Sequence, residues 1–167
     1  MQPGETAIGE AAIRTCLEAV SDPEIPGLSI QDLGILRDVG VDGETVVVTI
    51  TPTYSGCPAM TFIEMNIRDV LLRAGIKAVE VKTVLAPAWT TDWLTEAGRE
   101  KLRALGIAPP EGRATGKAAL FGVDPEIACP RCGSKDTRQL SAFGSTACKA
   151  LYHCDRCLEP FDYFKCI

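Results

Sequence analysis

The stretch Thr51–Met60, TPTYSGCPAM, decides how we expect the chain to fold, because it leads a hydrophobic strand through a loop of small residues to a cysteine and a helix start. Pro58 follows Cys57 directly, and proline is favoured at the first helical position, so we predict that Cys57 is the N-cap. Free N–H groups at a helix start lower a cysteine pKa and make the thiolate a better nucleophile or metal ligand. The competing interpretation is a buried cysteine that fills space. The position before the helix favours the reactive role.

The sequence around this stretch predicts an α/β fold, a small α+β sandwich with a three-stranded mixed sheet. Asp42-Gly43 is the strongest hairpin signal in the chain, and the β-branched strand after it is typical of a central strand buried on both faces. A strand that follows the next helix should run parallel to that central strand. We expect helices over 8–20 and 58–74, a serine-capped turn over 29–34, and strands over 35–41, 44–51 and 77–85.

Two tryptophans, Trp89 and Trp93, stand at the start of a further predicted helix that runs to Gly106, with Thr90 or Thr91 as its cap. We expect both rings to be core anchors, whereas exposed rings would indicate a contact for a protein partner. A segment rich in proline and glycine follows and is typical of a linker. We therefore divide the chain into an α/β domain over 1–108, a linker over 109–123 and a second module over 124–167.

The second module contains the most specific motif, two C-x2-C pairs separated by 21 residues. Two such pairs on turns joined by strands complete a tetrahedral four-thiolate site, as in a zinc ribbon. Zinc is the expected metal, although a mononuclear iron site uses the same ligands. So small a module needs the metal for much of its stability. The second pair lacks the glycine that follows the first, which predicts a less regular turn. The predicted ligands are Cys129, Cys132, Cys154 and Cys157.

The remaining cysteines and the single histidine have weaker signals. Cys16 lies beside the apolar stripe of the first helix and is expected to fill space. We expect Cys148 to pack within the ribbon hairpin and Cys166 to be a free thiol. Either of these two could instead replace a cysteine of the two C-x2-C pairs, which we call the knuckles, or join Cys57 in a second metal centre. His153 is expected to point away from the metal.

Composition excludes several classes of function. No apolar run is long enough to span a bilayer and the N-terminus lacks the pattern of a signal peptide, so we expect a cytoplasmic location without membrane contact. Eight cysteines in a reducing compartment suggest metal ligands or reactive thiols. The net charge of −5 comes from residues 1–123, with 11 basic and 16 acidic side chains, and the last 44 residues balance. Without a basic excess, nucleic-acid binding is disfavoured.

Asp22 and Glu24 flank a proline in the turn after the first helix. Acids in such turns usually form the turn and stay solvated. Their alternative role is to face the Cys57 loop as partners for a cation or a metal. The sequence alone leaves both interpretations open.

The segments DPEIPGLSIQDLGILRDV, TPTYSGCPAM and APAWTTDW resemble the metal-sulfur cluster assembly factor family, small α/β domains linked to cytosolic iron–sulfur cluster assembly. With CPRCGS, FGSTACKALYHC and EPFDYFKCI, the whole chain resembles the family of D subunits of the multicomponent phenylacetyl-CoA epoxidase, a ring-epoxidising oxygenase of aerobic phenylacetate catabolism. The resemblance implies Cys57 as the functional thiol and Asp22 and Glu24 as supporting acids. It also implies the four knuckle cysteines as metal ligands.

An accessory role follows from what the chain lacks. A di-iron oxygenase subunit needs several Glu-x-x-His elements, and a reductase needs a dinucleotide turn and a ferredoxin cysteine pattern. We therefore expect a subunit without its own catalytic centre that helps assemble or deliver the iron–sulfur cluster of the reductase component. Cys57 would hold iron or a cluster transiently, with other epoxidase subunits as partners. Pairing of two Cys57 residues in a homodimer stays open.

Two other classes of function compete with this interpretation. One is a structural or regulatory interaction subunit of the oxygenase, in which Cys57 has no role. The other is a thiol enzyme with Cys57 as nucleophile, which is disfavoured because the only histidine lies in the ribbon.

Overall fold

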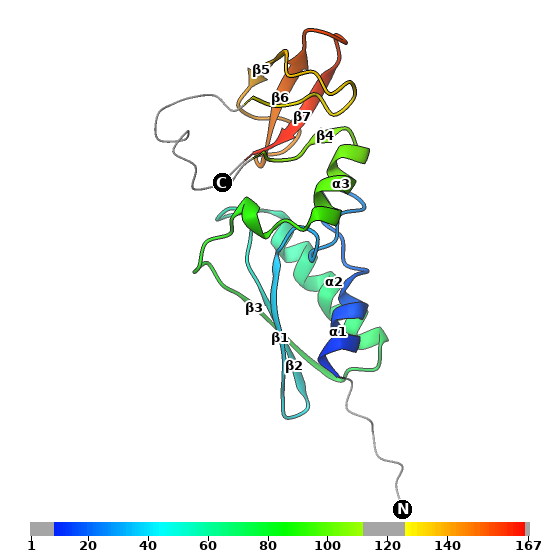
Figure 1. Ribbon diagram of the computed structural model, residues 1–167. Helices are drawn as coiled ribbons and strands as arrows, with labels where there is room; N and C mark the ends of the chain where they lie inside the picture. The colour runs from blue at the N-terminus through cyan, green and yellow to red at the C-terminus, as the bar shows by residue number, and fades with distance from the viewer. Residues whose placement is uncertain (1–8, 112–125, 166–167) are drawn as a thin grey trace, which may run out of the picture.

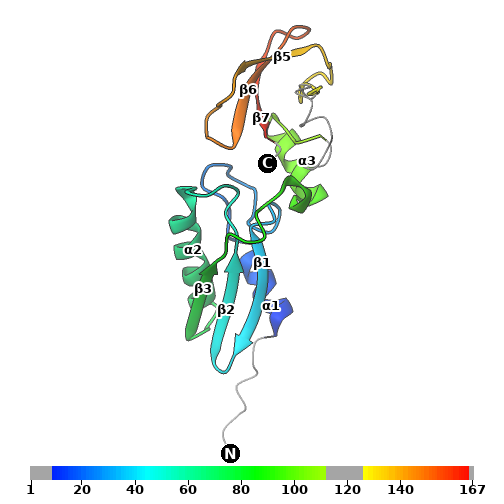
Figure 2. The ribbon, with the colours of Figure 1, turned by 90° about the vertical axis from the view of Figure 1, so that its left-hand side faces the viewer.

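The structure is a computed structural model that describes residues 9–111 and 126–165, and its first part is a three-stranded sheet covered on one face by two helices (Figures 1 and 2). Strand β1 pairs antiparallel with β2, and β3 pairs parallel with β2 on the other side. This arrangement confirms the predicted mixed sheet. The elements are α1 (Glu10–Leu17), β1 (Leu36–Asp42), β2 (Thr45–Ile50), α2 (Ala59–Arg73) and β3 (Ala78–Thr83).

The two helices bury the faces that their apolar spacing predicts. Ile13 and Leu17 of α1 are fully buried, and so is the same face of α2 at Ile63 and Ile67. Helix α1 ends before position 20, and the start of its predicted range, residue 8, lies outside the described residues. Helix α2 ends at Arg73, and Gly75 just beyond its C-cap has a φ of +89°, the left-handed conformation that glycine adopts without strain.

Two expectations for the hairpin are wrong in detail. Asp42 pairs with Thr45, so the two-residue loop is Gly43-Glu44, one position later than predicted. Gly43 has a φ of +61°, which suits the first position of such a loop. Strand β2 buries alternate residues only, because both helices lie on one face of the sheet. Its other face is half-buried and continues into the charged residues Glu80 and Lys82 of β3.

The predicted helix after the tryptophans is divided into two. A 3₁₀ turn, η1 (Thr91–Trp93), begins at Thr90, whose hydroxyl accepts a hydrogen bond from the Asp92 N–H. Helix α3 (Glu96–Ala104) then has its own cap, because the Thr95 hydroxyl accepts from the Gly98 N–H. Each short element therefore satisfies its own N-terminal donors.

Asp32 joins the turn at 29–34 to α3. Its side chain accepts a hydrogen bond from the Ser29 N–H at 2.9 Å, and the Asp32 N–H donates to the Ser29 hydroxyl at 3.1 Å, so the predicted serine cap is present. The Lys101 ammonium pairs with the Asp32 carboxylate, and the Thr95 N–H donates to the Asp32 carbonyl. A Cβ on Gly98 would lie 2.7 Å from that carbonyl oxygen, so the helix approaches closely only because glycine is there.

The second sheet has the order β4-β7-β6-β5 and lies beyond α3 (Figure 1). Strands β5, β6 and β7 are antiparallel and confirm the predicted ribbon strands, whereas β4 adds parallel to β7. Strand β4 comes from the α/β side of the predicted linker, most of which lies outside the described residues. The domain boundaries stay a prediction. The strands are β4 (Ile107–Ala108), β5 (Thr137–Ser141), β6 (Lys149–Cys154) and β7 (Pro160–Phe164).

Trp89 packs between the two parts. Its ring is 4% exposed, its indole N–H donates to the Leu33 carbonyl at 2.8 Å, and its centroid lies 6.0 Å from that of Phe164 on β7. Trp89 is therefore the core anchor that the sequence predicts. Trp93 is half-buried instead, with the Arg37 guanidinium 3.4 Å from the centre of its ring. None of the helices over 9–111 and 126–165 is long and apolar enough to cross a membrane.

We expect Asp32→Asn to lower the free energy of unfolding by about 1–3 kcal/mol at neutral pH, because a charged, buried hydrogen-bonding partner is lost. Burial opposes ionisation of Asp32, but Lys101 and the Ser29 hydrogen bonds hold its pKa below the ordinary value. The wild-type advantage should therefore be complete above about pH 3.9 and be lost as the pH falls through the lower folded-state pKa. Denaturant unfolding of both proteins at a series of pH values measures the loss of stability and its pH dependence. Asp42→Asn, in the exposed hairpin, is the control, and equal stability of the two variants would contradict the role of Asp32.

Candidate metal and thiol sites

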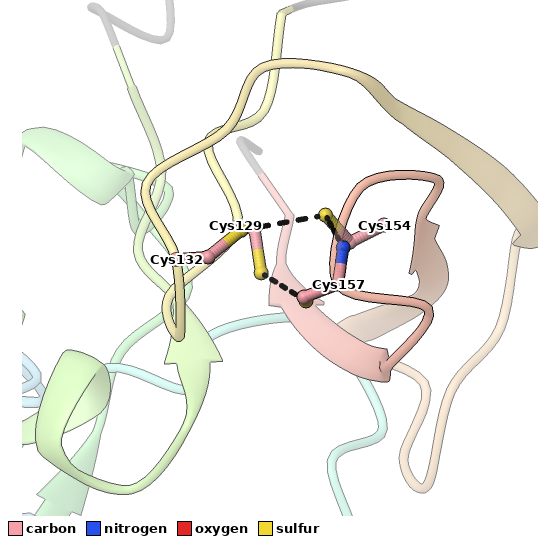
Figure 3. Close-up of side chains that lie close together, drawn as sticks. All are labelled: Cys129, Cys132, Cys154 and Cys157. Carbon is pink, nitrogen blue, oxygen red and sulfur yellow. Dashed lines mark hydrogen bonds between the residues drawn. The ribbon is translucent and has the colours of Figure 1, made fainter.

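The four knuckle cysteines converge at one end of the second sheet (Figure 3). Their Sγ atoms all lie within 4.8 Å of one another, with Cys129–Cys157 at 3.7 Å and Cys132–Cys154 at 3.6 Å. A tetrahedral zinc with Zn–S bonds of about 2.3 Å separates its ligand sulfurs by about 3.8 Å. The donor set and its spacing thus fit one tetrahedral, thiophilic metal ion.

Both knuckles have the same backbone hydrogen bonds. The Gly133 N–H donates to the Cys129 carbonyl and the Leu158 N–H donates to the Cys154 carbonyl, both at 2.9 Å. Gly133 has a φ of +74° and Leu158 a φ of +63°. The expectation of a less regular second turn is therefore wrong. Leu158 adopts the glycine conformation, at a cost of about 1–2 kcal/mol for a residue with a side chain.

Electrostatics within the knuckles favour a bound cation. The Cys157 N–H, 3.5 Å from the Cys154 sulfur, lowers the pKa of Cys154 to about 7. At Cys157 a hydrogen bond from the Glu159 N–H lowers the pKa, but desolvation and then the neighbouring thiols outweigh it and raise the value to about 12. Close thiolates repel one another, so full ionisation of the set needs a metal.

Cys57 lies in the loop before α2, half-buried against the core of the α/β part. Helix α2 begins one residue later than predicted, with Pro58 as its N-cap, and the Ala59 N–H donates to the Cys57 sulfur. The predicted fall in pKa is wrong. Burial raises the pKa of Cys57, the hydrogen bond from Ala59 opposes it, and the charges of Glu24 and Asp22 raise it further. The helix start is therefore present, but desolvation outweighs it.

Asp22 forms the turn, as one interpretation expected, and both acids lie near Cys57, whereas a role as partners of a cation stays a prediction. The Asp22 carboxylate accepts hydrogen bonds from the N–H groups of Glu24 at 2.7 Å and Ile25 at 3.1 Å. It is not solvated, since it is 7% exposed, and this burial raises its pKa. Glu24 is half-buried, and burial together with the charge of Asp22 raises its pKa also. Both acids lie within electrostatic range of Cys57.

Two residues that the sequence analysis did not single out are Tyr54, which contacts Cys57, and Lys149, which interacts with the two acids near it. The Tyr54 hydroxyl shares a hydrogen bond with the Cys57 side chain. Lys149 opens strand β6, is 4% exposed, and interacts electrostatically with Asp22 and Glu24. A lysine inside the otherwise apolar run KALYHC was the available signal for it.

The other residues considered from the sequence have simple surroundings. Cys16 is half-buried against the core, as expected of a filler. The His153 ring nitrogen lies 3.0 Å from the Asp155 carboxylate. Cys148 is buried, but in the core cluster of the α/β part and not in that of the ribbon. Cys166 lies outside the described residues.

Both parts of the chain match known families. Residues 10–85 match the family described as iron-sulfur cluster assembly protein, and residues 113–165 match the PaaD zinc beta ribbon domain. The chain is 52% identical over 151 residues to the D subunit of the "Putative 1,2-phenylacetyl-CoA epoxidase" of Escherichia coli (strain K12), covering 90% of this chain and 89% of that protein. The chain belongs to the family of phenylacetyl-CoA epoxidase D subunits.

The N-terminal part has relatives that lack this combination. It is 40% identical over 93 residues to an Fe-S protein maturation auxiliary factor of Porphyromonas gingivalis, covering 52% of this chain and 84% of that protein. The DUF59 domain structure from Bacillus anthracis shares 32% identity at a TM-score of 0.53, covering 56% of this chain and 90% of its own. The structure of a conserved hypothetical protein of Thermotoga maritima shares 27% identity at a TM-score of 0.51, covering 59% of this chain and 98% of that protein. The α/β part of this family of epoxidase components therefore has the DUF59 fold.

We expect Cys129→Ser to release the bound metal and unfold the ribbon, because removal of one thiolate leaves a module that cannot stabilise itself by burial. Cys57→Ser is the matched control and should keep both the metal and the fold. Metal content by mass spectrometry and the amide NMR spectrum measure the two effects. Unfolding of the α/β part by Cys57→Ser would show instead that Cys57 is a core residue.

Leu158→Gly should raise the free energy of unfolding of the ribbon by about 0.5–1 kcal/mol. Relief of the left-handed strain, about 1–2 kcal/mol, exceeds the conformational entropy that glycine loses on folding, about 0.5–1 kcal/mol. The measurement is the denaturant midpoint of the metal-loaded protein. Leu140→Gly removes another exposed leucine, from β5, where φ is not positive, and should destabilise. A lower denaturant midpoint for both variants than for the wild type would rule out strain at Leu158.

Proposed function

We propose that this chain is an accessory, non-catalytic component of a phenylacetyl-CoA epoxidase system that assists assembly or delivery of the iron–sulfur cluster of the reductase component. Cys57 acts as a transient ligand of iron or of a cluster, with Asp22 and Glu24 as supporting acids. The other epoxidase subunits are its partners. The ribbon holds a resident metal, for which zinc is the default with four thiolates, and provides structure or a docking surface.

The observation that carries this proposal is the position of Cys57. Its thiol is half-buried just before α2, receives a backbone hydrogen bond, and interacts electrostatically with the buried Asp22 and the half-buried Glu24 carboxylates. Such a thiol with negative neighbours is suited to a cationic, thiophilic cargo. The surroundings are less suited to nucleophilic catalysis, because the charges of Glu24 and Asp22 disfavour the free thiolate.

The two cysteine sites differ in the number of protein ligands. This is the difference expected between a site for a resident metal and a site for a transient cargo. The knuckle site is complete, with four thiolates in tetrahedral reach, so its metal is held firmly and keeps no open position. The Cys57 loop presents one half-buried thiol, and the turn after α1 adds two carboxylates within its electrostatic range. Fewer protein ligands leave positions for sulfide or for ligands of the receiving protein, which transfer needs.

The test is the iron and sulfide content of the reductase component purified after co-expression with wild-type chain, with Cys57→Ser, or without it. We expect full cluster loading only with the wild type. Cys16→Ser, which changes another half-buried thiol of the same domain, should load the reductase as the wild type does. Full loading in every case would contradict the proposal and favour a structural or regulatory interaction subunit.

If zinc is the resident metal, we expect the purified protein with an intact ribbon to contain one zinc ion and no iron at the knuckles. Elemental analysis of the Cys57→Ser variant measures this directly, because the cargo thiol is then absent. One iron per chain with the ferric tetrathiolate absorption would show instead that the ribbon holds iron.

A further inference from the structure

The ribbon meets the α/β part at the loop that contains Cys57. Figure 2 shows strand β6 beginning directly above the loops that precede β1 and α2. Cys148 and Lys149, at the beginning of β6, are each 4% exposed. Cys148 belongs to the core cluster of the α/β part, and Tyr54 and Cys57 pack against that same cluster. Two thiols from distant parts of the sequence thus share one buried region.

Tyr54 interacts with both thiols. Its hydroxyl is hydrogen-bonded to Cys57 and interacts electrostatically with Cys148 and with Glu24. Burial first, and then these neighbours, raise the pKa of Tyr54 to about 12, so its hydroxyl stays protonated and can donate. On the ribbon side, the Thr146 hydroxyl lies 3.0 Å from the Cys148 sulfur. Each thiol therefore has a hydroxyl beside it and shares the same acidic neighbours.

The charges around this region are unbalanced. The buried Lys149 ammonium lies 3.8 Å from the Asp162 carboxylate and also interacts with Asp22 and Glu24. Three carboxylates thus surround one ammonium, and both Asp22 and Glu24 act on Cys57 and on Cys148. Lys149 offsets part of the negative charge without removing it. A cation that also prefers sulfur ligands fits this combination of thiols and carboxylates.

We propose that Cys148 is the second thiol ligand of the cargo site, so that an iron-bearing cargo is held between Cys57 of the α/β part and Cys148 of the ribbon. The inference rests on the function proposed above and adds a ligand to it. Within 9–111 and 126–165, the knuckle cysteines alone form a group of three or more ligands close enough to hold a metal. The inference therefore requires the two thiol side chains to turn toward one another when the cation binds.

Lys149 is a positioning residue in this site. Its ammonium keeps the Asp22 and Glu24 carboxylates and the Asp162 carboxylate of β7 in one region, so that the beginning of β6 stays against the Cys57 loop. The ribbon then has a role beyond its own metal, because its docking brings the second thiol to the cargo.

The test uses full-length protein with zinc in the ribbon and adds cobalt(II) without oxygen as a probe for ferrous iron. Zinc binds more tightly than cobalt to the same ligands, so the knuckles keep their zinc. We expect one additional cobalt per chain, with thiolate-to-cobalt absorption. Cys57→Ser and Cys148→Ser should each weaken this binding by more than the roughly 10–100-fold caused by loss of an outer-shell partner. Cys16→Ser is the control and should bind cobalt as the wild type does.

X-ray absorption at the cobalt edge of the wild-type protein avoids any dependence on folding of the variants. Two sulfur neighbours support the inference, and one sulfur neighbour overturns it. Normal cobalt binding by Cys148→Ala with loss of binding by Cys57→Ser would also overturn it, while the proposed function would stand. Absence of cobalt binding to the wild type would overturn it as well. The co-expression experiment decides the proposed function separately, since it measures cluster loading and not the number of ligands.

Discussion

The packing of Trp89 is the interaction on which the relation between the two parts depends. Its buried indole donates to the Leu33 carbonyl and its ring meets the edge of Phe164 at 6.0 Å, so one side chain contacts both the α/β loops and β7. Strand β6 pairs with β7, and Cys148, just before β6, is buried in the core cluster of the α/β part. The Trp89 contact ties β7 to the loop that contains Leu33. With it, the beginning of β6 becomes part of the surroundings of Cys57.

Local signals in the sequence predicted most helices and strands. They failed where long-range packing determines which faces and side chains are buried. The spacing of Ile13 and Leu17 and the C-x2-C pairs specify a helix face and a ligand set within a few residues. The β-branched run of β2 does not reveal that only one face of the sheet is covered. The proline after Cys57 indicated the helix start, but not the burial and carboxylates that raise the thiol pKa. Burial of Lys149 depends on how the ribbon docks, which no periodic pattern expresses.

The two thiol sites are suited to different kinds of metal binding. The knuckles bring four sulfurs within 4.8 Å and so suit a metal that stays. The Cys57 region has fewer thiols, two neighbouring carboxylates and a buried lysine, and so suits a cation that is bound and released. Strain at Leu158 indicates that the tetrahedral geometry of the knuckles outweighs a local backbone cost. By our inference, the ribbon of this chain provides a ligand to the cargo site in addition to holding its own metal.

The most direct measurement is cluster transfer between purified proteins. The chain, with zinc in its ribbon and a reconstituted iron–sulfur cluster, is mixed without oxygen with reductase component from which the cluster has been removed, and the electron paramagnetic resonance signal of the reduced reductase is followed. Our account predicts that wild-type chain restores the signal and that folded, zinc-loaded Cys57→Ser does not. Equal restoration by both proteins would contradict the central claim that Cys57 holds the cargo.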